Sequence, residues 1–437
     1  MGGPRSGTRT LIGWGLYSSL VVWAPLAGPA TAAKPNYDES KVPAYQLPDP
    51  LVLSDGTKVT DKETWRTKRR PEVMRLFAQH VYGVTPTKKV AMRVETFDDT
   101  ADAIGGLARR KQFAMRFGDG NDGPLVDMLL YLPASAKGPV PVFLTLNFYG
   151  NHTIHPDPGI RLNTRSWMRS NTEFGVVKNR ATEKSRGVRI SRWPVEKILA
   201  RGYGIAAIYY GDIDPDFHDE FKNGVHPLLD DYKEGRPAEA WGSIGAWAWG
   251  LSRAMDVLEG EDAINPKQVI VMGHSRLGKT ALWAGAQDER FAITISNDSG
   301  CGGAALSQRA FGETIGIITS AFPHWFCGRL RDYAGKEGTM PVDQHQLIAL
   351  CAPRPVYVAS SAADFWADPR GEFLACVGAS PVYKLFGLEG LPVSEMPAVG
   401  KAVHGTIGYH VKAGKHDLTE FDWQRYMNFA DKQFAGK

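Results

Sequence analysis

The sequence has few cysteines, no large excess of either charge and, beyond its N-terminal segment, no apolar run long enough to span a membrane. None of the cysteine spacings matches a zinc-binding pattern, so we expect buried thiols, or at most one or two disulfides. A net charge of only +4 argues against a nucleic-acid partner. No internal repeat or low-complexity tract is found. The four cysteines all lie in the C-terminal half, at Cys301, Cys327, Cys351 and Cys376.

The N-terminal segment, residues 1–33, resembles a secretory signal peptide. It carries Arg5 and Arg9, then an apolar run from Leu11 to Leu26, then the small residues Ala30-Thr-Ala32. We therefore expect a secreted or periplasmic protein, without a membrane anchor once the segment is removed. The remaining residues, 34–437, are predicted to form a single catalytic domain, with 154–200 and 212–237 as insertions.

The central segment of the sequence runs from Gln268 to Ala286. An apolar β-branched run leads into a turn that carries Ser275 between Gly273 and Gly278, and an alanine- and leucine-rich stretch follows. This pattern predicts a strand, a sharp turn and a helix. In α/β-hydrolases such a turn exposes a nucleophilic serine at a helix N-terminus. The usual G-x-S-x-G pattern is broken because Leu277 stands where its second glycine is expected.

The same segment also matches a phosphate-binding loop. Gly273–Thr280 fits G-x-x-x-x-G-K-[ST], in which backbone amides and the lysine hold nucleotide phosphates. Asp298, which ends the apolar run from Phe291, could then serve as a magnesium ligand. A nucleotide-binding protein is therefore an alternative of a different class. A carbohydrate-binding protein without catalytic activity is a third, weaker one.

The rest of the chain alternates apolar strands with helical segments, which indicates an α/β fold. Alternating runs predict antiparallel strands at Val90–Phe97, Gln112–Phe117 and Leu125–Leu132. Continuous apolar runs then predict strands buried on both faces. These lie at Val140–Asn147, Ile205–Tyr210, Gln268–His274, Phe291–Asp298 and Arg354–Ser361, with a last short strand that ends within Val411–Asp417. Helices are predicted at Lys62–Tyr82, Ala238–Gly260 and Glu420–Phe434.

The order of polar residues after these strands favours the hydrolase. A serine nucleophile needs a base and an acid that orients it, and in α/β-hydrolases these follow in the order serine, acid, histidine. His416 precedes the last helix, and Asp364 and Asp368 lie in the loop after the strand that ends at Ser361. A phosphate-binding loop would leave these residues without a role.

Several motifs together resemble the glucuronoyl esterases of carbohydrate esterase family 15, in the bacterial branch. They occur in the family's order from about Val140 to the last helix. The motifs are Gly273–Lys279, Asn297–Ala305, Gly312-Glu313, Phe322–Phe326, Trp366–Gly371 and Lys415-His416.

The resemblance implies an α/β-hydrolase: a three-layer sandwich with a mostly parallel central sheet and insertions at the active-site edge. It implies cleavage of the ester between 4-O-methyl-D-glucuronic acid of glucuronoxylan and lignin alcohols. We expect no metal or cofactor; the oligomeric state is not determined by the sequence, and a monomer is expected. Ser275 would be the nucleophile, His416 the base and Arg276 part of the oxyanion site. Lys279 and Glu313 would bind sugar hydroxyls, and Trp366 would line the sugar pocket. An esterase for another carbohydrate ester, such as an acetylated sugar, is the close alternative.

The sequence departs from fungal members of that family near the catalytic residues. Asp298 stands where fungal members have glutamate, and its shorter side chain favours Asp364 as the orienting acid, with Asp298 as the second candidate. His274 and Asp417 occupy positions that hold cysteines in fungal members. The disulfide that joins those positions is therefore expected to be absent.

Overall fold

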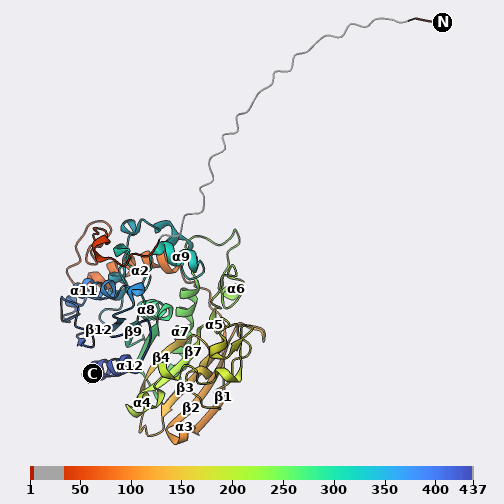
Figure 1. Ribbon diagram of the computed structural model, residues 1–437, viewed down its shortest axis with the longest axis vertical. Helices are drawn as coiled ribbons and strands as arrows, with labels where there is room; N and C mark the ends of the chain where they lie inside the picture. Colours follow the sequence, from red (N-terminus) through yellow and green to blue (C-terminus); the bar gives the residue numbers. More distant parts are fainter. Residues whose placement is uncertain (4–33, 436–437) are drawn as a thin grey trace.

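The computed structural model describes residues 1–3 and 34–435, so most of the predicted signal segment lies outside the described residues. Its central feature is a ten-stranded sheet in the order β1-β2-β3-β7-β4-β8-β9-β10-β12-β11 (Figure 1). From β7 to β12 neighbouring strands are parallel, whereas β1, β2 and β3 at one edge and β11 at the other pair antiparallel. The predicted α/β class with a mostly parallel sheet is confirmed.

Apart from β11, which was not predicted, the sheet strands agree with the predicted apolar runs, with some shifts in their ends. The largest shifts are at β1, which begins and ends later than predicted, and at β12, which begins earlier and ends at Lys412. The bounds are β1 Met92–Asp102, β2 Ala108–Phe117, β3 Leu125–Pro133, β4 Val140–Asn147, β7 Gly204–Tyr209, β8 Ile264–His274, β9 Ile293–Asn297, β10 Val356–Ser361, β11 Ala402–His404 and β12 Ile407–Lys412. A separate hairpin joins β5, Val176–Val177, to β6, Arg180–Ala181.

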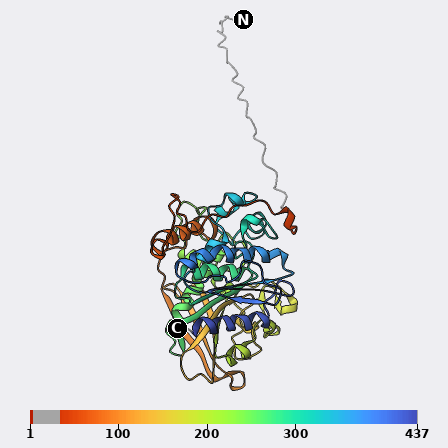
Figure 2. The same ribbon diagram turned by 90° about the vertical axis from the view of Figure 1, so that its left-hand side faces the viewer.

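Helices cover both faces of the sheet. The predicted helix over Lys62–Tyr82 is a continuous run of α and π turns, and the helix predicted from Ala238 begins at Ser243. Figure 2 shows α11 and α12 on opposite sides of the sheet. The helices are α1 Lys62–Thr64, α2 Arg70–Phe77, α3 Ala103–Gly106, α4 Val195–Ala200, α5 Tyr210–Ile213, α6 His226–Leu229, α7 Ser243–Glu259, α8 Arg276–Gln287, α9 Ile315–Ala321, α10 Gln344–Ala349, α11 Pro369–Leu385 and α12 Glu420–Phe434.

Alternation along the central strands builds two separate cores. In β8, Val269 and Val271 belong to the core beneath α7, α8 and α11, whereas Ile270 and Met272 belong to the core beneath α4 and α12. Successive side chains of a strand point to opposite faces, so a continuous apolar run is needed where both faces are covered. Helix α4 lies within the range predicted as an insertion, yet its buried Val195, Ile198 and Leu199 are spaced to pack on the sheet.

The cysteines and helices settle two further expectations. Cys301, Cys327, Cys351 and Cys376 are all buried and free, so the thiol alternative is correct and no disulfide joins them. Within the described residues, no helix combines the length and the apolar character needed to cross a membrane.

Candidate active site

Ser275 forms the whole connection between β8 and α8. Its backbone has φ 59° and ψ −131°, a strained positive-φ conformation that costs a non-glycine residue about 1–3 kcal/mol and that persists where the surroundings enforce it. Its N–H donates to the carbonyl of Asn297 over 2.8 Å, which ties the turn to β9. Ser275 is also the N-cap residue of α8, so its hydroxyl lies at the positive end of the helix dipole.

Two glycines allow this tight turn. A Cβ on Gly273 would lie 1.9 Å from the carbonyl oxygen of Leu277, so only glycine fits where the helix passes the strand. A Cβ on Gly278 would lie 3.0 Å from the side chain of Ser299, in the loop after β9. Leu277 itself is buried in the core. The break in the G-x-S-x-G pattern is therefore accommodated by Gly278, one residue later.

The geometry of Gly273–Thr280 differs from that of a phosphate-binding loop. Gly273 and His274 belong to β8 and Arg276–Thr280 to α8, so a single residue remains to form a loop. The Lys279 side chain is buried and donates to the carbonyl of Ser299 over 2.5 Å. A cradle of loop amides around a phosphate is not formed here.

Polar residues from four strand ends meet at one edge of the sheet. Ser275 follows β8, Asp298 follows β9, Asp364 lies beyond β10 and His416 beyond β12. The carboxyl ends of parallel strands lie at the same edge, so loops far apart in the sequence are neighbours there. Ser275 and His416 both line one cavity of about 290 Å³.

His416 is held by Asp364. Its Nδ1 atom donates to Oδ2 of Asp364 over 2.6 Å, and the Asp364 side chain is only 4% exposed whereas that of His416 is 38% exposed. A buried carboxylate bonded to Nδ1 sets the ring orientation and leaves Nε2 as the atom able to take a proton. The imidazole of His274 packs beside His416, with ring centroids 4.6 Å apart.

Asp298 has other partners. Its Oδ2 accepts a hydrogen bond of 2.8 Å from Ser361 and lies 3.4 Å from the amine of Lys412. Burial raises the pKa of Asp298 to about 6, although the charge of Lys412 opposes the shift. Ligand atoms of Asp298, Asp364 and His416 lie within 4.8 Å of one another, yet Nδ1 of His416 is already engaged with Asp364 and Asp298 is matched by Lys412.

A buried glutamate holds the loop that follows Asp298. Glu372 in α11 accepts from the backbone amides of Ser299 (2.8 Å) and Gly300 (3.0 Å), and it bonds the Ser360 hydroxyl over 2.5 Å. Burial and the nearby negative charge of Asp298 raise the pKa of Glu372 to about 8.

This shift predicts a fall in stability with rising pH. The Glu372 carboxyl binds a proton more tightly in the folded than in the unfolded chain. Its contribution to the free energy of unfolding is therefore complete below its ordinary pKa of 4.5 and is lost as the pH rises to about 8. Glu372→Gln cannot ionise, so between pH 5 and pH 9 its free energy of unfolding should gain about 1–4 kcal/mol relative to the wild type. Urea unfolding at both pH values measures this, and parallel pH profiles of the two proteins would contradict the shifted pKa.

Arg276, the first residue of α8, is fixed by a carboxylate that the sequence did not point to. Asp216 bonds its guanidinium and also accepts from Tyr210 (2.8 Å), His324 (2.9 Å) and Trp325 (2.7 Å). Burial alone would raise the pKa of Asp216, but the His324 hydrogen bond and the Arg276 charge outweigh it and hold the pKa well below its usual range. The guanidinium carbon also lies 4.6 Å from the centroid of the Trp325 ring.

The remaining wall of the cavity is basic and aromatic. Its arginines come from residues 154–200, the range predicted as an insertion. The high arginine content of that range was the sequence feature that could have indicated a basic cavity wall. With Ser275, Arg276 and His416, the lining comprises Phe148, Tyr149, Arg169, Phe174, Arg189, Arg192, Tyr210, Asp216 and His274.

The residues expected to bind the sugar form a separate group outside this lining. The amine of Lys279 lies 3.6 Å from Glu313, and the Glu313 amide donates to the carbonyl of Trp366 over 2.9 Å. Burial raises the pKa of Glu313, and the charge of Lys279 opposes that shift. Trp366 is 40% exposed, as a stacking platform requires, whereas a buried indole would only pack.

Fold and site together define an α/β-hydrolase with a serine at its strand-to-helix turn. The family described as fungal glucuronyl esterase matches residues 204–387. A carbohydrate esterase from an unknown prokaryotic organism is 52% identical over 98% of this chain and 99% of its own. The chain belongs to the glucuronoyl esterases of carbohydrate esterase family 15 and is a carboxylic ester hydrolase.

Two solved structures show the same relationship. A promiscuous esterase of this family from a marine bacterial metagenome is 53% identical, with a TM-score of 0.86 over 92% of this chain and 100% of that one. A glucuronoyl esterase from Solibacter usitatus is 47% identical, with a TM-score of 0.85 over 90% and 100% of the two chains.

Proposed function

We propose that the protein hydrolyses esters between 4-O-methyl-D-glucuronic acid of glucuronoxylan and lignin alcohols, by a Ser-His-Asp acyl-enzyme mechanism. The observation that carries this proposal is the 2.6 Å bond between His416 and the buried Asp364, on a cavity that Ser275 also lines. Family membership supports the substrate class.

The chemistry begins at Ser275. Nε2 of His416 takes the hydroxyl proton as Oγ attacks the ester carbonyl, and the imidazolium that forms is stabilised by Asp364. The tetrahedral intermediate collapses when its C–O bond to the alcohol breaks and His416 protonates the leaving oxygen. Water then attacks the acyl-enzyme with the same base, which releases the uronic acid and restores Ser275.

Charge on the carbonyl oxygen is stabilised by Arg276 at the N-terminus of α8. A guanidinium is useful there only if it already points at the oxygen, because turning it during the reaction would cost energy. Asp216 supplies this orientation, since its other hydrogen bonds, from Tyr210, His324 and Trp325, fix the carboxylate itself. Asp216 is thus a positioning residue for Arg276.

The sugar is bound by Lys279, Glu313 and Trp366. Glu313 accepts hydrogen bonds from sugar hydroxyl groups, and Lys279 donates hydrogen bonds to hydroxyl oxygens. The exposed side chain of Trp366 stacks on the pyranose ring.

The substrate assignment predicts a clear preference in a simple assay. Purified protein should hydrolyse methyl and benzyl glucuronate with kcat/KM at least about tenfold above that for an acetylated xylose, because only the uronate places a sugar ring at Trp366 and its carbonyl at Ser275. Release of acid at constant pH measures both reactions, with Ser275→Ala as the blank.

A second candidate substrate is an acetylated sugar, and the promiscuity stated for the 53% identical relative favours testing it. A kcat/KM for the acetyl ester equal to or above that for the glucuronates would replace the uronate assignment with this one.

We also propose that the protein is exported and that residues 1–33 are removed. Mature protein recovered from the culture medium or the periplasm should begin near Lys34, which N-terminal sequencing would establish.

A further inference from the structure

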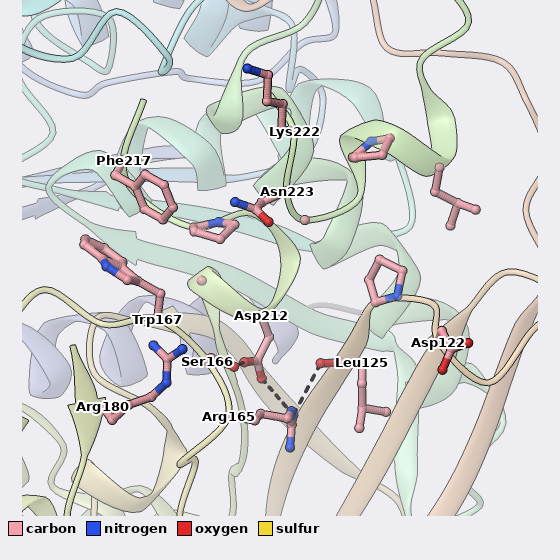
Figure 3. Close-up of a pocket in the computed structure, with 16 residues that line it drawn as sticks. Asp122, Leu125, Arg165, Ser166, Trp167, Arg180, Asp212, Phe217, Lys222 and Asn223 are labelled. Carbon is pink, nitrogen blue, oxygen red and sulfur yellow. Dashed lines mark hydrogen bonds and ion pairs between the residues drawn. The ribbon is translucent and has the colours of Figure 1, made fainter. Parts of the chain in front are cut away.

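A second, larger cavity lies beside the catalytic one. It has a volume of about 750 Å³, against about 290 Å³ for the cavity at Ser275. Pockets that bind small-molecule ligands have volumes of roughly 300–1,000 Å³. Figure 3 shows Trp167 and Phe217 on one side of it, Leu125 on the other, and Ser166, Asp212 and Arg165 along its floor. We call it the Trp167 pocket.

The two cavities share a wall. Along the segment after β7, Tyr210 and Asp216 line the catalytic cavity, whereas Gly211, Pro215 and Phe217 line the Trp167 pocket. The segment 165–169 is divided in the same way, with Arg169 on the catalytic cavity and Trp167 on the other side. The two cavities are therefore neighbours, separated by one layer of residues.

The aromatic side of the pocket is suited to a sugar ring. The rings of Trp167 and Phe217 have centroids 4.7 Å apart and are inclined at 53°, and both residues are only partly buried. An aromatic pair left in contact with solvent and rimmed by polar groups is a typical binding surface. The apolar face of a pyranose can cover it.

The polar groups of the pocket favour a ligand rich in hydroxyls. Asn223 points into the pocket, and its exposed side chain makes no hydrogen bond with the described part of the chain. Among the described residues, the exposed Arg180 guanidinium donates only to the neighbouring carbonyl of Asn179, at 2.9 Å. The floor is already neutralised, because Asp212 accepts from Asn163 over 2.8 Å and from Arg165 over 3.3 Å. Free donors above an engaged floor suit neutral oxygen acceptors better than a cation.

We propose that the Trp167 pocket is a subsite for pyranose units of the polysaccharide chain that carries the ester. This inference rests on the proposed function, since it assumes that the sugar at Ser275 belongs to a longer chain. Trp167 and Phe217 would stack on one unit, and Asn223 and Arg180 would donate to its hydroxyl and ring oxygens.

The test compares two substrates in the wild type, Trp167→Ala, Phe217→Leu and Asn223→Ala. One is methyl 4-O-methyl-glucuronate and the other is the same ester attached to a β-1,4-linked xylo-oligosaccharide. The ratio of kcat/KM for the long over the short ester should fall about 5–20-fold in Trp167→Ala, mostly through KM, because one stacking contact is lost. Phe217→Leu keeps apolar bulk without a flat face and should lower the same ratio. Phe386→Ala, a partly buried aromatic that lines neither cavity, is the control.

Two further measurements separate the possible failures. Calorimetric titration of the wild type with the unesterified xylo-oligosaccharide should show binding, and Trp167→Ala should raise the Kd by the same factor, about 5–20-fold. This measurement does not depend on whether the protein cleaves the ester. Binding without hydrolysis of any glucuronate ester would refute the proposed function and keep the subsite. Unchanged ratios and unchanged titrations would overturn the subsite. A change in the benzyl-to-methyl ratio instead would assign the pocket to the alcohol and overturn it as well.

Discussion

Replacing Asp364 by alanine should lower kcat on methyl glucuronate by about 10³–10⁴-fold, the largest effect expected from a residue other than Ser275 and His416. Loss of the carboxylate frees Nδ1 of His416, so the ring no longer presents Nε2 to Ser275 and its imidazolium loses a stabilising charge. KM should change little, because Asp364 does not line the cavity. Steady-state kinetics of Asp364→Ala and Asp364→Asn measure the effect, and Ser275→Ala gives the residual rate.

Asp298 provides the matched comparison. Asp298→Asn should lower kcat less than about tenfold, because the carboxylate accepts from Ser361 and pairs with Lys412, while Nδ1 of His416 is bonded to Asp364. A loss in Asp298→Asn as large as in Asp364→Asn would mean that both carboxylates act on His416. A near-normal Asp364→Asn would transfer the orienting role to Asp298.

The second large effect concerns Asp216. Asp216→Asn should lower kcat by about 10²-fold and up to 10³-fold, the range measured when one oxyanion donor is removed, because Arg276 would lose the partner that aims it. KM should rise far less than kcat falls if Arg276 acts mainly in the transition state.

A double-mutant cycle distinguishes this role from a structural one. In an Arg276→Ala background, Asp216→Asn should cost almost nothing further, since a residue that acts through Arg276 has no effect once Arg276 is gone. Additive losses would show that Asp216 supports the site in another way. Thermal unfolding of each variant checks the fold, and Asp212→Asn, a buried carboxylate on the same segment but outside the catalytic cavity, is the control for burial alone.

Much of the fold could be predicted because its signals are local. Continuous apolar runs at β4, β7 and β10 are needed where helices cover both faces of a sheet, and each run can be recognised without knowing its neighbours. The ends of elements were less accurate. Helix α7 begins at Ser243 rather than Ala238, because the residues before it pair with a distant segment: the Gly242 amide donates to the carbonyl of Tyr82 over 3.1 Å, and the Glu239 carbonyl accepts from the Val84 amide over 2.8 Å.

By itself the sequence determined the α/β class, the turn at Ser275 and the order of serine, acid and histidine, since short patterns encode strands, turns and the sequence of loops. Only the tertiary structure decided that His416 bonds Asp364 while Asp298 bonds Ser361, and that Asp216, sixty residues before Arg276, holds its guanidinium. Hydrogen bonds require contact within about 3 Å, and the loops that supply these partners are brought together by the pairing of different strands, which spacing along the chain does not record.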